Sequence, residues 1–155
     1  MAQTLEPWLH LLHVVAATVW LGGGVAMVLV AARTRSSSNA QAMTEFARTI
    51  PFVGIRVLGP ALVVVLATGL AMVLTSAAWS FTQPWVLIGL GLFAIAFLIG
   101  AVFMSRAGIR LDRAARGDGP RAELPSLLLR WLIGYSVILA VLLVAMGDMV
   151  LKPGL

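Results

Sequence analysis

The hydrophobic positions of this 155-residue chain fall into four long runs rather than into an alternating pattern. Apolar runs of about 20 residues are typical of helices that cross a lipid bilayer, because at 1.5 Å per residue they match its hydrocarbon core. The pattern therefore predicts an all-α fold, the four-helix bundle of an integral membrane protein. The predicted spans are residues 8–32, 57–75, 85–104 and 127–151. They fill the chain as a single transmembrane domain.

Prolines and tryptophans mark where these spans enter the membrane. The first span starts with Pro7 and Trp8, since proline suits the first turn of a helix and tryptophan suits the headgroup region. A secretory signal peptide would require basic residues before its apolar segment, but no Lys or Arg precedes Trp8. We therefore expect this span to be retained in the protein. The connector 76–83 between the second and third spans is short and uncharged.

Two polar segments connect the spans at the opposite end. Residues 42–50 carry apolar side chains at helical spacing, which predicts a short interfacial helix. Residues 105–130 are expected to form a loop, with an evident turn at 117–120. This loop contains Arg106, Arg110, Arg113, Arg116, Arg121 and Arg130.

Composition excludes a soluble enzyme, because 61% of the residues are hydrophobic, 11% are charged and the mean hydropathy is +1.01. The net charge of +5 comes from arginines near the two polar segments, whereas Lys152 is the basic residue of the other end. The positive-inside rule then places both termini outside the cytoplasm of a bacterial plasma membrane. We interpret this charge as a topology signal with anionic headgroups as partners, and not as nucleic-acid binding.

Few ionisable groups lie inside the spans, and each one therefore needs an explanation. They are His10 and His13 in the first span and Asp148 in the fourth, all near the outer face, where His10 and Asp148 lie at similar depth. His10 and His13 are separated by three positions and share a helix face, so the pair could chelate one metal ion. Further candidate ligands at the same end are Met72, Met146, Asp148 and Met149.

The ligand types leave two cofactors open. Imidazole with thioether suits copper. A haem could take one of the histidines and a methionine as axial ligands, or remain five-coordinate, but adjacent side chains on one helix cannot hold both faces of a porphyrin. The chain has no cysteine, which excludes thiolate sites and disulfides.

Simpler roles remain open for the same residues. The histidines could bond to headgroups, to water or to a neighbouring span at a helix end, Asp148 could pair with Lys152 one turn later, and the methionines could fill the core. In the first and fourth spans, residues that recur at alternating steps of three and four positions form a stripe along the helix. We expect these stripes to face the bundle interior, and their small residues allow close helix packing or a homo-oligomer. These stripes are His10, His13, Ala17, Trp20, Gly24, Met27 and Ala31, and Trp131, Gly134, Ile138, Val141, Ala145 and Asp148.

Residues 9–23, Leu-His-Leu-Leu-His-Val-Val-Ala-Ala-Thr-Val-Trp-Leu-Gly-Gly, resemble the opening span of the CopD-like superfamily. Residues 56–62, 67–70 and 151–154 look closest to its small four-span bacterial members of unknown function. The resemblance to HemJ-type members implies a haem at His10 or His13, and the resemblance to CopD implies copper passage. The chain lacks the further histidines and spans of a CopD transporter.

We therefore predict a haem b or copper site near the extracytoplasmic face, for electron transfer or metal handling. The alternative is a noncatalytic accessory subunit that packs against a larger membrane complex and needs no cofactor. No catalytic residue is predicted, and whether the chain is an enzyme stays open.

Overall fold

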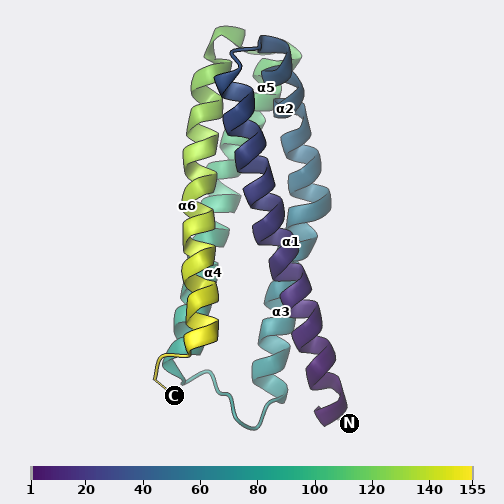
Figure 1. Cartoon of the computed structure of the whole chain (residues 1–155), viewed down its shortest axis with the longest axis vertical. Coiled ribbons are helices and arrows are strands. Elements are labelled where there is room, and N and C mark those ends of the chain that lie inside the picture. The colour runs from purple at the N-terminus through teal and green to yellow at the C-terminus, as the bar shows by residue number, and fades with distance from the viewer. Residues whose placement is uncertain (1, 155) are drawn as a thin grey trace.

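Four long helices run antiparallel along the molecule (Figure 1). The computed structural model describes residues 2–154, with side chains from residue 5 onward. The elements are α1 (Ala2–Ser36), α2 (Ala40–Val53), the π-helical η1 (Gly54–Leu58), α3 (Gly59–Thr75), α4 (Pro84–Leu98), the π-helical η2 (Ile99–Met104), α5 (Ser105–Arg116), the 3₁₀ turn η3 (Arg121–Glu123) and α6 (Leu124–Leu151). Within residues 2–154, four helices are long and apolar enough to cross a membrane. The predicted all-α membrane bundle is confirmed.

The segment 42–50 differs from the interfacial helix that we expected. It lies within α2, which continues through η1 into α3 as one helix over Ala40–Thr75. Its apolar face packs inside the bundle, where Phe46 and Trp131 meet edge to face with ring centroids 5.7 Å apart. The amphipathic face is therefore covered by helices of the same chain rather than by headgroups.

The segment 105–130 also differs, because most of it is helical instead of a loop. Helix α5 continues from η2 to Arg116 and buries Leu111, Ala114 and Ala115. It ends at Gly117, whose φ of 90° lies in the left-handed region that glycine adopts most readily. Only a short turn then separates α5 from η3. The arginines thus cover the outer face of a packed helix.

The bundle is longer than a bilayer is thick. Helix α1 has 35 residues, roughly 52 Å at the usual rise, against a hydrocarbon core of about 30 Å. We call the end that carries α2, α5 and the connections around them the arginine end, and the end with both termini the terminal end (Figure 1). The arginine end is the better packed, with Ala31, Ala47, Leu111 and Leu128 at 1% exposure or less.

The second long helix consists of α2, η1 and α3, and the third consists of α4, η2 and α5. The two pack together at the arginine end and diverge toward the terminal end. Near Ile50, α2 contacts α5, since a Cβ on Gly108 would lie 3.5 Å from the Ile50 Cγ2. Beyond η1 and η2, no described Cα of α3 lies within 8 Å of a Cα of α4. Pro60 lacks the N–H that would continue regular α-helical bonding, which accounts for the irregular turn at η1.

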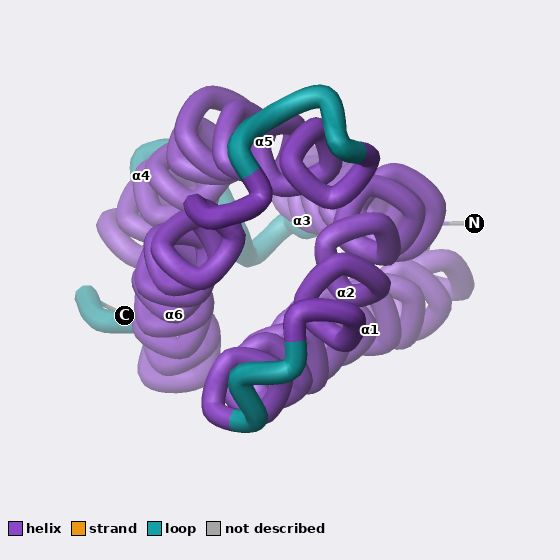
Figure 2. The backbone as a smooth tube through the Cα atoms, turned by 90° about the horizontal axis from the view of Figure 1, so that it is seen from above, coloured by secondary structure: helices purple, strands orange, loops and turns teal. Residues whose placement is uncertain are grey.

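Seen from above, the helices form a ring in which α1 neighbours α3 and α6, and α6 neighbours α4 (Figure 2). Helix α1 approaches α6 closely at Gly24, where an added Cβ would lie 2.7 Å from Tyr135 Cε1 and 2.9 Å from Leu139 Cδ2. Small residues thus set the helix spacing in the middle of the bundle. The side without such contact, between α3 and α4, is where the bundle opens.

Candidate functional site

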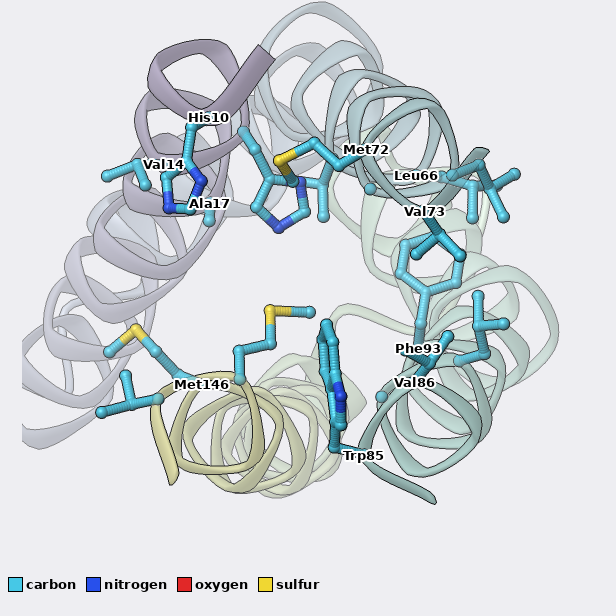
Figure 3. A pocket seen from close by; sticks show the side chains of 18 of the residues that line it. His10, Val14, Ala17, Leu66, Met72, Val73, Trp85, Val86, Phe93 and Met146 are labelled. Carbon is cyan, nitrogen blue, oxygen red and sulfur yellow. The ribbon is translucent and has the colours of Figure 1, made fainter. Parts of the chain in front are cut away.

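A cavity of about 630 Å³ occupies the terminal end between the diverging helices (Figure 3). Its walls come from α1, α3, α4, α6 and the connector between α3 and α4. Most lining side chains are apolar or aromatic, and Lys152, His10 and His13 are the titratable groups among the described lining residues. Small-molecule and cofactor sites commonly have volumes of about 300–1,000 Å³, so this cavity has the size of a ligand site.

His13 is buried in the wall of the cavity and bonds to the neighbouring helix. Its Nδ1 atom lies 3.0 Å from the Oγ1 atom of Thr68. The Thr68 hydroxyl has one hydrogen and lies 2.6 Å from the Val64 carbonyl oxygen and 3.3 Å from that of Val65, and both oxygens can only accept. With its hydrogen used there, the hydroxyl accepts the hydrogen of His13 Nδ1. The hydrogen bond therefore selects the tautomer in which Nε2 carries the free lone pair.

The Nε2 atom of His13 remains available to a ligand. Within the described residues it makes no hydrogen bond, and it is not among the buried nitrogen and oxygen atoms that lack a partner. His13 is one of the residues that line the cavity. A histidine whose other nitrogen is held by a hydrogen bond is the usual arrangement of a metal-binding imidazole.

Gly69 provides the space that this imidazole occupies. A Cβ on Gly69 would lie 3.3 Å from the His13 Cε1 and 3.6 Å from its Nδ1. The α1 and α3 backbones can therefore approach with the ring between them. Residues 67–70, Ala-Thr-Gly-Leu, were identified from the sequence only as part of a family resemblance. The role of Thr68 and Gly69 in holding His13 was not predicted. The one signal for it in the sequence is a hydroxyl residue next to a glycine inside an apolar span.

His10 lines the same cavity but is exposed (Figure 3). No hydrogen bond of its side chain is found within the described residues. The two histidines, which the spacing treated as equivalent, thus differ in burial and in support. Only His13 is held in one orientation by its neighbours.

The predicted methionine ligands also line the cavity. Met72 on α3 and Met146 on α6 lie on opposite sides of it (Figure 3). Met149, also on α6, lines the cavity as well. Met72 is buried, whereas Met146 and Met149 are partly open to the surroundings of the bundle. The structure therefore brings five of the six predicted ligand residues to one cavity.

Asp148 is the exception. Its carboxylate is buried against α4, where a Cβ on Gly89 would lie 3.3 Å from Oδ2, and Asp148 is not among the described lining residues. Both carboxylate oxygens lack a hydrogen-bond partner in the described part of the chain, and neither His10 nor Lys152 pairs with them. No group of three or more His, Asp or Glu able to hold a metal ion occurs among the described residues.

Lys152 instead turns toward two tryptophans. Its Nζ atom lies 4.7 Å from the ring centroid of Trp79 and 5.4 Å from that of Trp85. The two indole rings meet edge to face with centroids 5.5 Å apart. The two indole rings thus form a cation-binding surface for an ammonium group at the edge of the cavity.

Comparison with known proteins places the chain in a family. Residues 7–153 match the family described as predicted integral membrane protein (DUF2269), and the chain belongs to this family. No curated protein matches the chain, and no solved structure does. The family, with the four long apolar helices, defines a multi-pass membrane protein.

Proposed function

We propose that the cavity binds a b-type haem with His13 as an axial ligand, and that the protein serves electron transfer or metal handling. The observation that carries this proposal is the state of His13, whose Nδ1 is held by Thr68 while Nε2 stays free at the cavity. Neutral imidazole in a fixed orientation is a common axial ligand of haem iron.

The surroundings of His13 fit a large, mostly apolar cofactor. The cavity volume of about 630 Å³ lies within the range of cofactor sites, and its walls are largely apolar. Met72 or Met146 would be the second axial ligand, since both line the cavity and methionine with histidine is a known haem ligand pair. When bound, haem supplies a redox-active iron, and burial with ligand choice sets its potential.

The resemblance of residues 9–23 to the opening span of CopD-like proteins supports the same assignment. HemJ-type members of that superfamily imply a histidine of this span as a haem ligand, and the hydrogen bond to Thr68 favours His13 over His10 for that role. With the arginines facing the cytoplasm, the cavity would open near the outer face of a bacterial plasma membrane.

A copper site in the same cavity is the second candidate. The thioethers of Met72, Met146 and Met149 line it together with His13, and soft thioether with imidazole suits copper. Haem is preferred because a single ion would leave most of the cavity volume unfilled. Elemental analysis distinguishes the two.

Purification in detergent followed by absorption spectroscopy tests the haem proposal. The wild-type protein, as isolated or after addition of hemin, should show a Soret band with stoichiometric binding. His13→Ala should lose it, and His10→Ala should keep it as the matched control. Because His13→Ala could also unfold the helix pair, His13→Gly with added imidazole provides a second variant, and imidazole should restore the band.

Two outcomes would contradict the proposal. Wild-type protein that binds no hemin stoichiometrically would exclude a haem site, and a His13→Ala variant with an unchanged spectrum would exclude this ligand. A colourless, metal-free protein that copurifies with a larger membrane complex would favour the accessory-subunit function.

A further inference from the structure

Lys152 has a backbone conformation that is unusual for its residue type. Its φ is 43° and its ψ is 63°, in the left-handed region where a residue with a Cβ is strained. Helices usually place glycine in such a position at their C-terminus, and Gly154, two residues later, has a φ of 91°. A lysine here is thus costly for the backbone, and such strained residues concentrate at functional sites.

The left-handed turn returns the lysine side chain toward the cavity. The Lys152 N–H bonds to the Asp148 carbonyl oxygen at 2.8 Å and closes the end of α6. The ammonium then lies over the rings of Trp79 and Trp85, and Lys152 becomes part of the cavity lining. Because an indole ring attracts a cation without using its N–H donors, the ammonium is positioned while its hydrogen bonds remain available.

No Asp or Glu side chain in the described part of the chain pairs with this ammonium. Among the described residues, no Asp or Glu oxygen lies within 4.0 Å of the Lys152 Nζ, and the nearby Asp148 side chain lies against Gly89 instead. No Asp, Glu or Arg occurs among the described lining residues. The described lining of the cavity is therefore mostly apolar, with the Lys152 ammonium at its edge.

We propose that Lys152 is the anchor for a carboxylate of the cavity ligand, so that the site selects an amphiphile with an apolar body and an acidic end. This inference rests on the proposed function, and for haem the group bound would be a propionate. A carboxylate paired with an ammonium in apolar surroundings forms a charge-assisted hydrogen bond, which is stronger than a neutral one. Lys152 thereby orients the ligand, with its acidic end at the terminal end of the bundle.

Titration of the detergent-purified apoprotein with hemin tests the anchor. Lys152→Asn removes the charge with a residue that tolerates positive φ, and it should weaken hemin binding about tenfold, which is ~1.4 kcal/mol. Lys152→Gly should weaken binding similarly without lowering the unfolding temperature, because glycine relieves the backbone strain. Lys152→Arg keeps the charge and should bind nearly as the wild type does.

Two further ligands separate this inference from the ligand role of His13. Haem dimethyl ester, which lacks free carboxylates, should bind the wild type about as weakly as hemin binds Lys152→Asn, and it should be insensitive to that variant. Protoporphyrin IX has the carboxylates but no iron, so its fluorescence titration should respond to Lys152→Asn and not to His13→Ala.

Equal hemin affinity of Lys152→Asn and wild type, or equal affinity for hemin and its ester, would overturn the anchor while leaving the His13 site intact. A protoporphyrin response to Lys152→Asn without any Soret shift of hemin would retain the anchor and overturn the axial ligand. Absence of binding by all three porphyrins would overturn both.

Discussion

The Nδ1 atom of His13 on α1 and the Oγ1 atom of Thr68 on α3 lie 3.0 Å apart, although the two residues are 55 positions apart in the chain. The bond joins two helices at the wall of the cavity. Because the Thr68 hydroxyl donates to Val64, the bond also determines which ring nitrogen of His13 faces a ligand. A single hydroxyl therefore connects helix packing with the chemistry of the site.

Thr68→Val should lower both the stability and the haem affinity of the protein. The variant keeps the side-chain shape but leaves the His13 N–H without its acceptor, which typically costs about 1–3 kcal/mol for a buried group. Thermal unfolding in detergent and hemin titration measure the two effects. Thr75→Val is the matched control, since the Thr75 hydroxyl is exposed and bonds only to the Ala71 carbonyl within its own helix. Equal behaviour of the two variants would show that the hydroxyl of Thr68 has no special role.

Gly24→Ala should destabilise the bundle. The added Cβ would lie 2.7 Å from the Tyr135 ring and 2.9 Å from Leu139, and such overpacking costs about 1–3 kcal/mol. Gly22→Ala is the control in the same helix, because its Cβ would meet nothing within 4 Å. We expect the melting temperature to fall for Gly24→Ala and to stay level or rise for Gly22→Ala. The opposite order would contradict the close approach of α1 and α6.

Paired cysteines should report the divergence of the second and third helices, and the absence of native cysteine makes the measurement clean. Ile50→Cys with Gly108→Cys should oxidise readily, since a Cβ on Gly108 would lie 3.5 Å from the Ile50 Cγ2 between α2 and α5. Val73→Cys with Val86→Cys, on α3 and α4, should stay reduced, because Cα atoms more than about 7 Å apart cannot form a disulfide. After mild oxidation, a maleimide of high mass labels only the thiols that remain free, so the shift on a gel counts them. Rapid oxidation of the second pair would show that the terminal end closes.

Single cysteines should report the orientation in the membrane. Ser80, in the connector at the terminal end, and Asp118, in the turn at the arginine end, are both exposed. The positive-inside rule predicts that Ser80→Cys reacts with an impermeant maleimide in intact cells, and that Asp118→Cys reacts only after the membrane is opened. The reverse pattern would place the cavity on the cytoplasmic side.

The apolar runs were sufficient to predict the four helices, because a helix is the arrangement that satisfies every backbone group of a single segment in lipid. They were insufficient for residues 42–50 and 105–116. Both segments are amphipathic, and an amphipathic face can be buried equally well by headgroups or by another helix. The two segments pack against each other across the arginine end, by contacts such as that of Ile50 with Gly108, and residues 42–50 also pack against α6 at Trp131.

The candidate site shows the same division. Spacing identified His10 and His13 as a pair, and residue type identified the methionines as possible ligands. Spacing along one helix could not distinguish the two histidines, since the difference between them is made by Thr68 on another helix. Asp148 was expected near the histidines from its depth alone, but the direction of its side chain places the carboxylate against α4.

The amino-acid sequence alone thus determined what is local: which segments are helical, which are apolar enough for lipid, and which end carries the arginines. Tertiary structure alone decided what depends on neighbours: that two helices diverge to leave a cavity, that one imidazole is held in a single tautomer, and that the terminal lysine turns toward the tryptophans. The physical reason is the range of the interactions. Hydropathy and helical hydrogen bonds act within a few residues, whereas cavities and side-chain orientation arise from contacts between segments far apart in the chain.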